Sequence, residues 1–383
     1  MQNIIFAIWD NPRWYNTLIF SAKSFCDKNY NVHIIHRKAE KDSLGRIDFG
    51  KKTSFYSFGG EKKIFFLLDY FLFFLFSFKL IFLYKPRFLI IYNRKALFCN
   101  IFLNIFFPKL KIIYHNFDFD DPKNIKDIRN FLLTKLEFFL ARFCKILTFP
   151  NIERGNKFIN LANIKNTKVI EFLNCFPKNY YPKRSKSLSK ILNVNGNSLL
   201  VCRLGSIGPN HYIKELILSV RFWKKNTMLV IAGVVNSEKY LTELQDIIIK
   251  YQLKDRVKII ALVKNEMWFE ILFRSKIGIC FYEPNSLSHQ YMAGTSTKFN
   301  NYLYANVPFI AHQNRDFVLF NKKYNICKII NAKKPQQIAK AVNFLLNNKK
   351  IYLKLQKNGH ILFNKHMNFQ FQFDNFFNSI SRL

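Results

Sequence analysis

The sequence has few acidic residues, few glycines and prolines, and no closely spaced cysteines. Its 383 residues include 24 Asp and Glu, 12 Gly and 11 Pro. So little glycine and proline excludes a collagen-like or low-complexity chain. The seven cysteines are scattered and form no C-x-x-C pair, which is typical of a reducing compartment and not of a disulfide framework. Residues 1–10 lack the cationic segment of a signal peptide and resemble a buried strand, so we expect a cytoplasmic protein.

The shortage of acids leaves a strongly basic chain. Sixty Lys and Arg give a formal net charge of +36, and 49% hydrophobic residues exclude a disordered chain. The charge has two interpretations: it reflects the base composition of a genome that favours Lys, Ile, Asn and Phe, or it attracts polyanions such as lipid head groups. The sequence has no basic arm, zinc pattern or RNP-like motif, so we expect no nucleic-acid partner.

The longest apolar run covers residues 64–84, close to the ~20 residues of a membrane-spanning helix. Asp69 and Lys79 disfavour insertion, because each costs roughly 2.5–3.5 kcal/mol at the centre of a bilayer. The remaining interpretations are a buried helix of a globular domain and a Phe-rich helix lying on an anionic membrane surface. In the second case the lipid phosphates would be contacted by Lys62, Lys63, Lys79 and Lys85.

Short apolar runs alternate with helical patterns, which predicts an α/β chain of two Rossmann-like domains facing across a cleft. We expect an N-terminal domain at 1–180, a linker at 181–197, a C-terminal domain at 198–361, and a tail at about 362–383 that packs back on the first domain. The expected strands are 3–8, 31–36, 87–92, 111–115, 145–149, 169–173, 198–203, 228–233, 257–261, 277–282 and 309–311. Ligands of such sheets bind at the carboxyl ends of the strands.

The loop at 203–211 leads from a predicted strand into a predicted helix and contains Arg203, Gly205, Ser206 and His211. Small residues before a helix N-terminus leave backbone N–H groups free to bind phosphate. Glycines in such a loop can also serve only to turn the chain. The sequence contains neither a P-loop nor a complete G-x-G-x-x-G motif.

A second candidate is the helix predicted after Ser296, a natural N-cap, and ended by Pro308. Lys298 lies in its first turn, where a cation opposes the helix dipole by a few tenths to about 1 kcal/mol. Such a lysine either points to water or shares a bound anion with the helix N-terminus.

Residues 296–310 resemble a motif of the GT-B-fold retaining glycosyltransferases of "group 1", s-x-K-ϕ-x-E-Y-x-x-x-G-x-P-ϕ-I, where ϕ is apolar. The matching positions are Ser296, Lys298, Phe299, Tyr302, Pro308 and Ile310. The resemblance implies a nucleotide-sugar donor whose diphosphate contacts Lys298 and the helix N-terminus at Ser296 and Thr297. Asn301 replaces the Glu that binds the nucleotide ribose, Asn306 replaces the Gly, and the family's other acid falls on Ala293.

The first loop resembles the same family's G-x-I-x-x-x-[KR]-G motif. Gly205 and Ile207 match, His211 takes the place of the basic residue, and Tyr212 takes the place of the final Gly. The nearby Arg203 could supply the cation. We therefore expect donor contacts from Arg203, Gly205, Ser206 and His211 as well as from Lys298 and Asn301.

In the N-terminal half, the strand 111–115 ends in His115, as a family strand ends in a His that faces the transferred sugar. The resemblance makes His115 the candidate catalytic residue, whereas a lone His after a strand otherwise serves as a structural hydrogen-bonding group. Asp10, Asn11 and Arg13 occupy the first strand-to-helix loop, which the resemblance places on the acceptor side, although relatives carry a Gly-rich turn there.

Asp118, Asp120 and Asp121 allow a comparison with the D-x-D metal site of the other major glycosyltransferase fold. That fold keeps its nucleotide site in the N-terminal half, whereas the phosphate candidates here lie in the C-terminal half. An acidic loop can also simply cap the following helix. We therefore expect no metal and no cofactor other than the nucleotide sugar, which is a co-substrate.

The resulting hypothesis is a metal-independent glycosyltransferase, retaining by resemblance, that acts on a glycan or lipid-linked glycan. The expected context is bacterial surface polysaccharide synthesis: capsule, lipopolysaccharide or O-antigen, or lipooligosaccharide. The enzyme would be cytoplasmic and peripheral on the inner face of the membrane. The alternative is a catalytically inactive GT-B-like sugar-binding or partner subunit, which Asn301 and Ala293 favour.

Overall fold

The computed structural model describes residues 2–37, 48–58, 66–185, 187–188, 191, 198–261 and 263–383. The chain divides into two compact units. The first comprises Met1–Asn174 with Phe369–Leu383, and the second comprises Cys175–Asn368. Part of the expected linker, at 186, 189–190 and 192–197, lies outside the described residues, as do Lys62 and Lys63.

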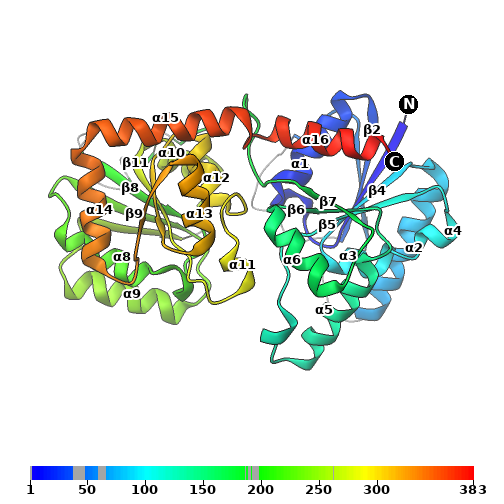
Figure 1. Ribbon diagram of the computed structural model, residues 1–383, viewed down its shortest axis with the longest axis horizontal. Helices are drawn as coiled ribbons and strands as arrows, with labels where there is room; N and C mark the ends of the chain where they lie inside the picture. The colour runs from blue at the N-terminus through cyan, green and yellow to red at the C-terminus, as the bar shows by residue number, and fades with distance from the viewer. Residues whose placement is uncertain are drawn as a thin grey trace. The chain divides into compact units, whose positions relative to one another are not determined.

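The first unit contains a seven-stranded sheet in the order β3-β2-β1-β4-β5-β6-β7, with every neighbouring pair parallel (Figure 1). Its strands are β1 Gln2–Ile8, β2 Tyr30–Arg37, β3 Thr53–Phe58, β4 Phe88–Tyr92, β5 Lys111–His115, β6 Ile146–Phe149 and β7 Lys168–Glu171. The central strands are continuous apolar runs because both faces of a parallel sheet are covered. The strand order reverses between β1 and β4, which makes their carboxyl ends a switch point where such sheets bind ligands.

The helices of the first unit are α1 Asn16–Asp27, α2 Phe66–Tyr84, α3 Arg94–Asn100, α4 Leu103–Phe106, α5 Ile128–Ala141, α6 Ile152–Ala162 and α16 Phe369–Ser381. The C-terminal helix α16 packs on α1 and β7 through aromatic rings. The Phe373 ring lies 5.1 Å from that of Phe25, and Phe376 stacks on Phe172 at 5.1 Å. These contacts explain why the end of the chain belongs to the first unit.

The Phe-rich helix α2 covers the sheet edge with one face and exposes the other. Phe73 is fully buried and stacks on Phe58 at 4.5 Å, whereas Phe71 and Phe82 are exposed. Asp69 forms an ion pair of 2.9 Å with Arg37. In the part of the chain that the structure describes, no helix combines the length and apolar character needed to cross a bilayer.

The second unit contains a six-stranded parallel sheet in the order β10-β9-β8-β11-β12-β13. Its strands are β8 Leu199–Leu204, β9 Thr227–Gly233, β10 Val257–Ala261, β11 Ser275–Cys280, β12 Phe309–His312 and β13 Cys327–Ile330. The order reverses between β8 and β11, so the loops after these two strands meet at the switch point.

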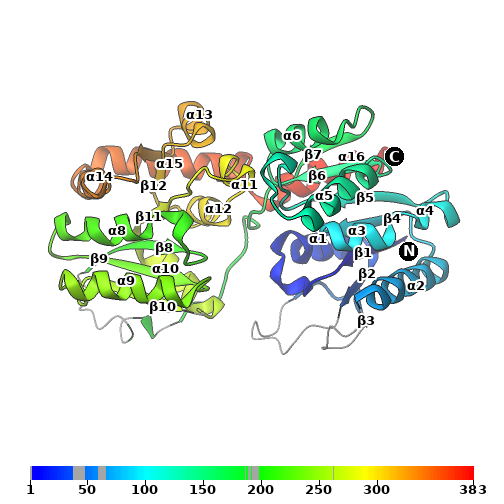
Figure 2. The same ribbon diagram turned by 90° about the horizontal axis from the view of Figure 1, so that it is seen from below.

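Its helices are α8 Ile213–Ser219, α9 Glu238–Lys250, α10 Asn265–Arg274, α11 Leu287–Gln290, α12 Thr297–Tyr304, α13 Arg315–Tyr324, α14 Pro335–Asn347 and α15 Lys349–Lys365. Apolar residues of α8, α9 and α14 form one core with alternate sheet residues such as Val201 and Ile279. Figure 2 shows α8 and α9 in front of strands β8 to β10. Helix α12 packs on the opposite face, where Tyr302 meets Cys202 and Gly278.

The predicted α/β class is confirmed, and the differences from the expected elements have local causes. Strands β3 and β13 are not among the expected strands; β3 is half-exposed and β13 has only four residues, so neither shows a long apolar run. The apolar pattern of residues 123–141 predicts one helix, but α5 begins at Ile128, because Asp127 accepts hydrogen bonds from the backbone N–H groups of Arg129 and Asn130.

The position of α12 depends on a close approach between Tyr302 and the sheet. The Tyr302 hydroxyl donates to the carbonyl oxygens of Cys202, at 3.2 Å, and Ile279, at 3.1 Å. A Cβ on Gly278 would lie 2.6 Å from ring atoms of Tyr302. Only glycine at position 278 therefore allows this packing.

We predict that Gly278→Ala lowers the free energy of unfolding by about 1–3 kcal/mol, because the new methyl group overpacks a rigid ring. Gly359→Ala is the matched control, since it adds the same methyl group within α15, where the nearest atom is a flexible Leu303 methyl at 3.2 Å. Urea unfolding of both variants measures the difference. Equal effects of the two substitutions would contradict the packing argument.

Candidate functional site

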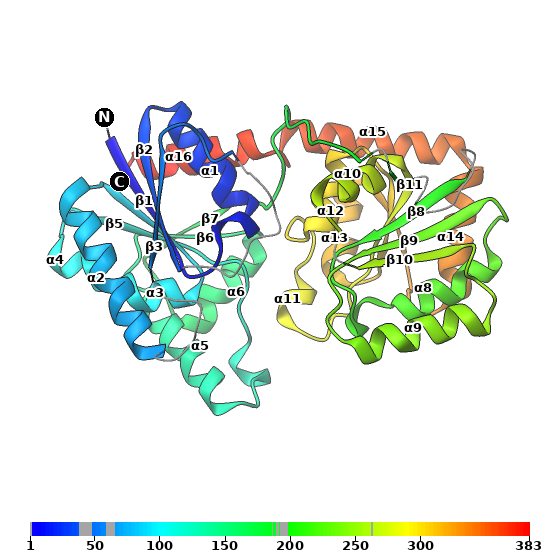
Figure 3. The ribbon, with the colours of Figure 1, turned by 180° about the vertical axis from the view of Figure 1, so that it is seen from behind.

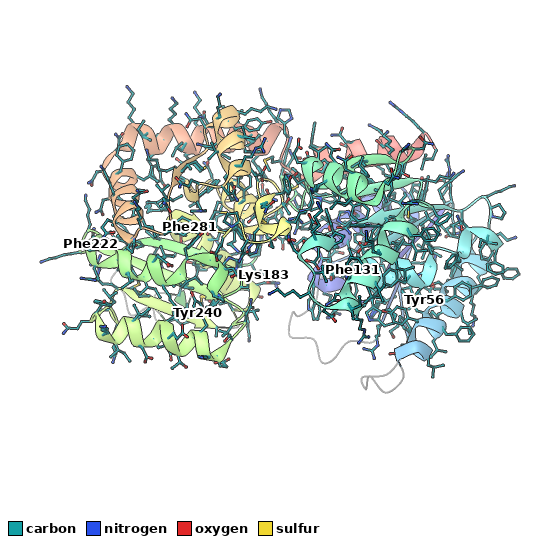
Figure 4. The ribbon with its side chains drawn as sticks, turned by 60° about the horizontal axis from the view of Figure 1, so that its bottom comes forward. Tyr56, Phe131, Lys183, Phe222, Tyr240 and Phe281 are labelled. Atoms are coloured by element: carbon teal, nitrogen blue, oxygen red, sulfur yellow. The ribbon has the colours of Figure 1, made fainter. Side chains whose placement is uncertain are left out.

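The loops after β8 and β11 and the start of α12 surround a pocket of about 290 Å³. Its lining consists of Ser206, Gly208, Pro209, Asn210, His211, Asn236, Tyr282, His289 and Lys298. Phe281, labelled in Figure 4, directly follows β11, and its carbonyl oxygen lies 3.3 Å from His211 Nδ1. The pocket therefore occupies the switch point of the second sheet.

Lys298 lies in the first turn of α12 and is buried, with only 6% of its surface exposed. Its Nζ lies 4.5 Å from the centroid of the Tyr282 ring. A Cβ on Gly205 would lie 2.9 Å from that nitrogen, and Gly205 has a φ of +118°. Glycine is needed at 205 both for its backbone conformation and for the approach of the lysine.

Arg203, at the end of β8, is a second buried cation, with 1% of its surface exposed. Its Nη1 donates to the carbonyl oxygen of Gly205 at 2.5 Å, whereas its buried Nη2 has no hydrogen-bond partner among the described residues. Burial and the neighbouring Arg203 hold the pKa of Lys298 well below its usual range, and burial also lowers the pKa of Arg203. Among the residues that the structure describes, neither cation has a carboxylate within ion-pair distance.

Two histidines complete the pocket. His211 Nδ1 faces the Phe281 carbonyl oxygen, and its Nε2 lies 3.4 Å from Ser206 Oγ. Burial, with the charges of Lys298 and Arg203, lowers the pKa of His211 to about 2, so the ring is neutral at physiological pH. His289 was not predicted; its ring lies 5.6 Å from that of His211, and its Nδ1 lies 3.0 Å from the Glu283 carbonyl oxygen. No sequence motif distinguishes His289.

The helix N-terminus beside Lys298 is rigidly held. Ser296 Oγ accepts a hydrogen bond from Phe299 N and lies 2.7 Å from the Tyr282 hydroxyl. Thr297 is the first helical residue and is exposed, and Asn301 is buried one turn further along α12. All eight residues predicted for donor binding lie in the second unit: Arg203, Gly205, Ser206, His211, Ser296, Thr297, Lys298 and Asn301.

Two departures from the family motif have structural counterparts. Asn306 has a φ of +56°, a conformation that favours glycine and that asparagine tolerates better than other residues. Asp316 of α13 accepts a hydrogen bond from the backbone N of Ala293 at 2.6 Å. A carboxylate therefore lies beside the position that lacks the family's acid, and it comes from a helix that the sequence pattern did not reveal.

In the first unit, the predicted acceptor-side residues lie at the carboxyl end of β1. Asp10 Oδ2 accepts hydrogen bonds from the Tyr15 hydroxyl and from Asn93 Nδ2, both at 2.9 Å. Asn11 Oδ1 accepts from the backbone N of Arg13 and so caps the short 3-10 helix Pro12–Trp14. Asn93 follows β4 with a φ of +65°, unusual for a residue other than glycine, and was missed because no motif contains it.

His115 lies at the end of β5 and is almost completely buried. Its Nδ1 lies 2.6 Å from Thr148 Oγ1, while its buried Nε2 has no hydrogen-bond partner within the part of the chain that the structure describes. The ring of Phe117 packs edge-on against it at 4.4 Å. Burial lowers the pKa of His115 to about 3, so this imidazole is neutral and can donate or accept a hydrogen bond without carrying charge.

A buried carboxyl group supports the loop after His115. Glu137 of α5 accepts hydrogen bonds from the Tyr114 hydroxyl and from Asn116 Nδ2, both at 2.7 Å. Burial raises the pKa of Glu137 to about 7. No sequence pattern indicates this network, because Glu137 lies within an ordinary helical pattern.

The acidic loop 118–121 has local structural partners. Asp118 lies 3.6 Å from Arg154 Nη1, and Asp121 Oδ1 accepts a hydrogen bond from the backbone N of Lys123. Asp120 is exposed. Within the described ranges, no group of three or more His, Cys, Asp or Glu is arranged to hold a metal ion.

We predict that Lys298→Met leaves the free energy of unfolding of the unliganded protein unchanged or raises it, because an apolar side chain of similar size replaces a buried charge without a counter-ion. The unfolded chain keeps this lysine protonated up to a pKa of about 10.4, whereas the folded protein does not. Stability of the wild type should therefore rise with pH between the lowered pKa of the folded protein and about pH 10.4, by at most about 1.4 kcal/mol per pH unit from this group. Chemical unfolding at several pH values measures both effects, and an unchanged pH slope in the variant would contradict them.

Comparisons with known proteins agree with this architecture. Residues 185–361 match the family model described as "Glycosyl transferases group 1", while no curated protein matches the sequence. Anabaena HepE in complex with UDP and glucose is 14% identical, with a TM-score of 0.73 and full coverage of both chains. Sucrose-phosphate synthase from Thermosynechococcus elongatus is 11% identical (TM-score 0.70, covering 100% of this chain and 99% of that one).

A glycosyltransferase from Rickettsia africae is 12% identical, with a TM-score of 0.70, and the match covers 98% of this chain and 97% of that one. At these identities the structural likeness establishes only the fold. The match to the family model adds the class of enzyme that the second unit resembles. The predicted family resemblance is thus confirmed. The chain has the GT-B fold, and the match of residues 185–361 to the group 1 family model together with these structures indicates a glycosyltransferase.

Proposed function

We propose that this glycosyltransferase takes its sugar from a nucleoside-diphosphate donor whose diphosphate binds in the pocket of the second unit. The observation that carries the proposal is the pair Lys298 and Arg203, two buried cations without a carboxylate in ion-pair distance among the described side chains. Burying like charges together is costly unless an anion compensates them. A diphosphate supplies that anion and extends toward the N-terminus of α12, whose free N–H groups also favour negative charge.

The same cations explain how sugar transfer is accelerated. When the bond between the anomeric carbon and the phosphate oxygen breaks, negative charge develops on the departing diphosphate. Fixed positive groups in a site with little water stabilise that charge more in the transition state than in the ground state. The acceptor hydroxyl oxygen bonds to the anomeric carbon, and its proton passes to the departing phosphate, since the pocket lining contains no carboxylate base. Lys298 and Arg203 make this route independent of a metal ion.

The uridine nucleotides are the donors to test first. The structures of Anabaena HepE contain UDP or UDP-glucose, and a structure from E. coli described as trehalose-6-phosphate contains UDP-2-fluoro glucose. Asn301, in place of the family's Glu, offers an uncharged amide to the ribose. The neutral His115 faces the transferred sugar, and the loop with Asp10, Asn11 and Arg13 contributes to the acceptor. Retention of the anomeric configuration follows from the family resemblance.

The proposed acceptor is a glycan or lipid-linked glycan of a bacterial surface polysaccharide, and the proposed location is the inner face of the cytoplasmic membrane. The net charge of +36 and the exposed apolar face of α2 support this location. A second candidate function is a catalytically inactive sugar-binding or partner subunit. Asn301 and Ala293 favour it, since both lack the acidic side chain of the family motif.

Donor binding by Lys298→Ala tests the phosphate pocket. We expect the Kd for UDP to rise about 30-fold or more, because the variant loses a buried charge-assisted contact. Lys322→Ala, an exposed lysine of α13, is the matched control and should bind UDP as the wild type does. Calorimetric titration measures both. Unchanged affinity in Lys298→Ala would remove this lysine from the donor site, and tight binding without donor hydrolysis or transfer would favour the inactive-subunit alternative.

His115→Asn separates binding from chemistry. We expect the Kd for UDP to stay within about twofold of the wild type, whereas kcat for transfer or donor hydrolysis falls about 100-fold, as for a lost polar contact to the reacting sugar. Since the pKa of His115 is about 3, kcat should show no step from this residue between pH 5 and 9. Thr148→Val, which removes only the partner of Nδ1, is the control for positioning and should have a smaller effect. Full activity of His115→Asn would remove His115 from the reaction.

A further inference from the structure

The first unit has a second pocket, of about 570 Å³, far from the residues predicted to meet the acceptor. Its lining consists of Asn104, Arg142, Phe143, Cys144, Lys145, Asn163, Ile164, Lys165, Asn166 and Thr167. Lys145 directly precedes β6, and residues 164–167 directly precede β7. The pocket therefore lies at the amino edge of the sheet, whereas Asp10 and His115 lie at the carboxyl edge. Its volume falls within the roughly 300–1,000 Å³ typical of small-ligand sites.

The lining of this pocket is cationic and contains no acidic residue. Arg142 Nε and Nη2 both donate to the carbonyl oxygen of Ala162, at 3.2 and 2.7 Å, which fixes the guanidinium at the rim. Lys145 and Lys165 are exposed and add two mobile ammonium groups. Asn163, Asn166 and Thr167 supply uncharged polar groups. Such a set favours an anion with several oxygen acceptors, such as a phosphate ester.

Large apolar side chains stand beside these cations. Phe143 of the lining is 47% exposed, and Ile105 and Phe106 of α4, next to Asn104, are 68% and 57% exposed. The Arg142 guanidinium lies 6.0 Å from the centroid of the Phe139 ring, which is also exposed. A water-soluble phosphate would need the cations but not this neighbouring apolar surface.

The apolar surface continues onto the Phe-rich helix. The Phe106 ring lies 5.5 Å from that of Phe78 on α2, and Figure 3 shows α2 and α4 side by side. The exposed face of α2 includes Phe82 and carries Lys79. A contiguous apolar patch rimmed by cations is characteristic of a surface that lies in the interface of an anionic bilayer.

We propose that the pocket around Arg142, Lys145 and Lys165 binds the phosphate of an anionic phospholipid head group, while α4 and Phe143 enter the interfacial layer of the bilayer. This proposal rests on the membrane location that we proposed above and adds a lipid-binding site to it. The site contains none of the donor or acceptor residues. Arg142 and the two lysines hold the phosphate, and Ile105 and Phe106 contact the acyl boundary. The catalytic edge of the sheet stays free because the lipid binds at the opposite edge.

Co-sedimentation of the full chain with lipid vesicles, without donor, tests the proposal. The wild type should bind vesicles of phosphatidylcholine with 30% phosphatidylglycerol much more strongly than phosphatidylcholine alone. Lys145→Gln with Lys165→Gln should lower the partition coefficient about 30-fold, since each lysine near an anionic surface contributes about fivefold. Ile105→Ser with Phe106→Ser should lower it at least tenfold, although it leaves every charge in place.

Lys224→Gln with Lys225→Gln is the matched control, because it removes the same charge from two exposed lysines of the second unit. An equal loss in this control would show that diffuse charge binds the vesicles and would overturn the proposal. The proposal would also be overturned if either double variant of the first unit bound the vesicles as strongly as the wild type does. Full release of the protein by millimolar glycerol phosphate would overturn it too, because it would indicate a site for a soluble phosphate. Circular dichroism verifies that each variant is folded. Donor hydrolysis in detergent should be the same for the variants and the wild type. A failure of the proposed membrane site can therefore be distinguished from a failure of the proposed donor site.

Discussion

Lys298 and Arg203 are buried close together, and among the residues that the structure describes neither has a counter-ion. Burial disfavours the charged form of both side chains, and the neighbouring Arg203 lowers the pKa of Lys298 further. A protein under selection for stability alone would place an apolar residue or a carboxylate there. Among the described residues, Arg203 Nη2 has no hydrogen-bond partner, and the proposed diphosphate would supply one.

The fold holds this costly arrangement in place through contacts that have nothing to do with charge. Tyr302 anchors α12 to two strands, and glycine at 278 and 205 allows the helix and the lysine to approach the sheet. Ser296 caps the helix and contacts the Tyr282 hydroxyl, so the ring beneath Lys298 Nζ is fixed as well. Since these groups are positioned before a ligand arrives, little reorganisation is needed on binding, which is the physical basis of electrostatic catalysis.

Local patterns in the sequence predicted the buried strands and the start of α12 after Ser296, because apolar runs and helix caps act over a few residues. They could not reveal contacts that depend on tertiary packing. His289, Asp316, Asn93 and Glu137 come from separate elements and become polar neighbours of the sites only when the sheets assemble. The departures at Asn301 and Ala293 were visible in the sequence, but the carboxylate beside Ala293 was not. Strand β3 escaped detection because its pattern is half-exposed.

The most direct test of the central claim is a crystal structure of the chain with UDP bound. The account predicts the diphosphate in the pocket after β8 and β11, with phosphate oxygens about 3 Å from both Lys298 Nζ and Arg203 Nη2. Lys298 would then be protonated and would gain the partner that the unliganded protein lacks. A diphosphate bound elsewhere, with both cations left as they are, would contradict the account.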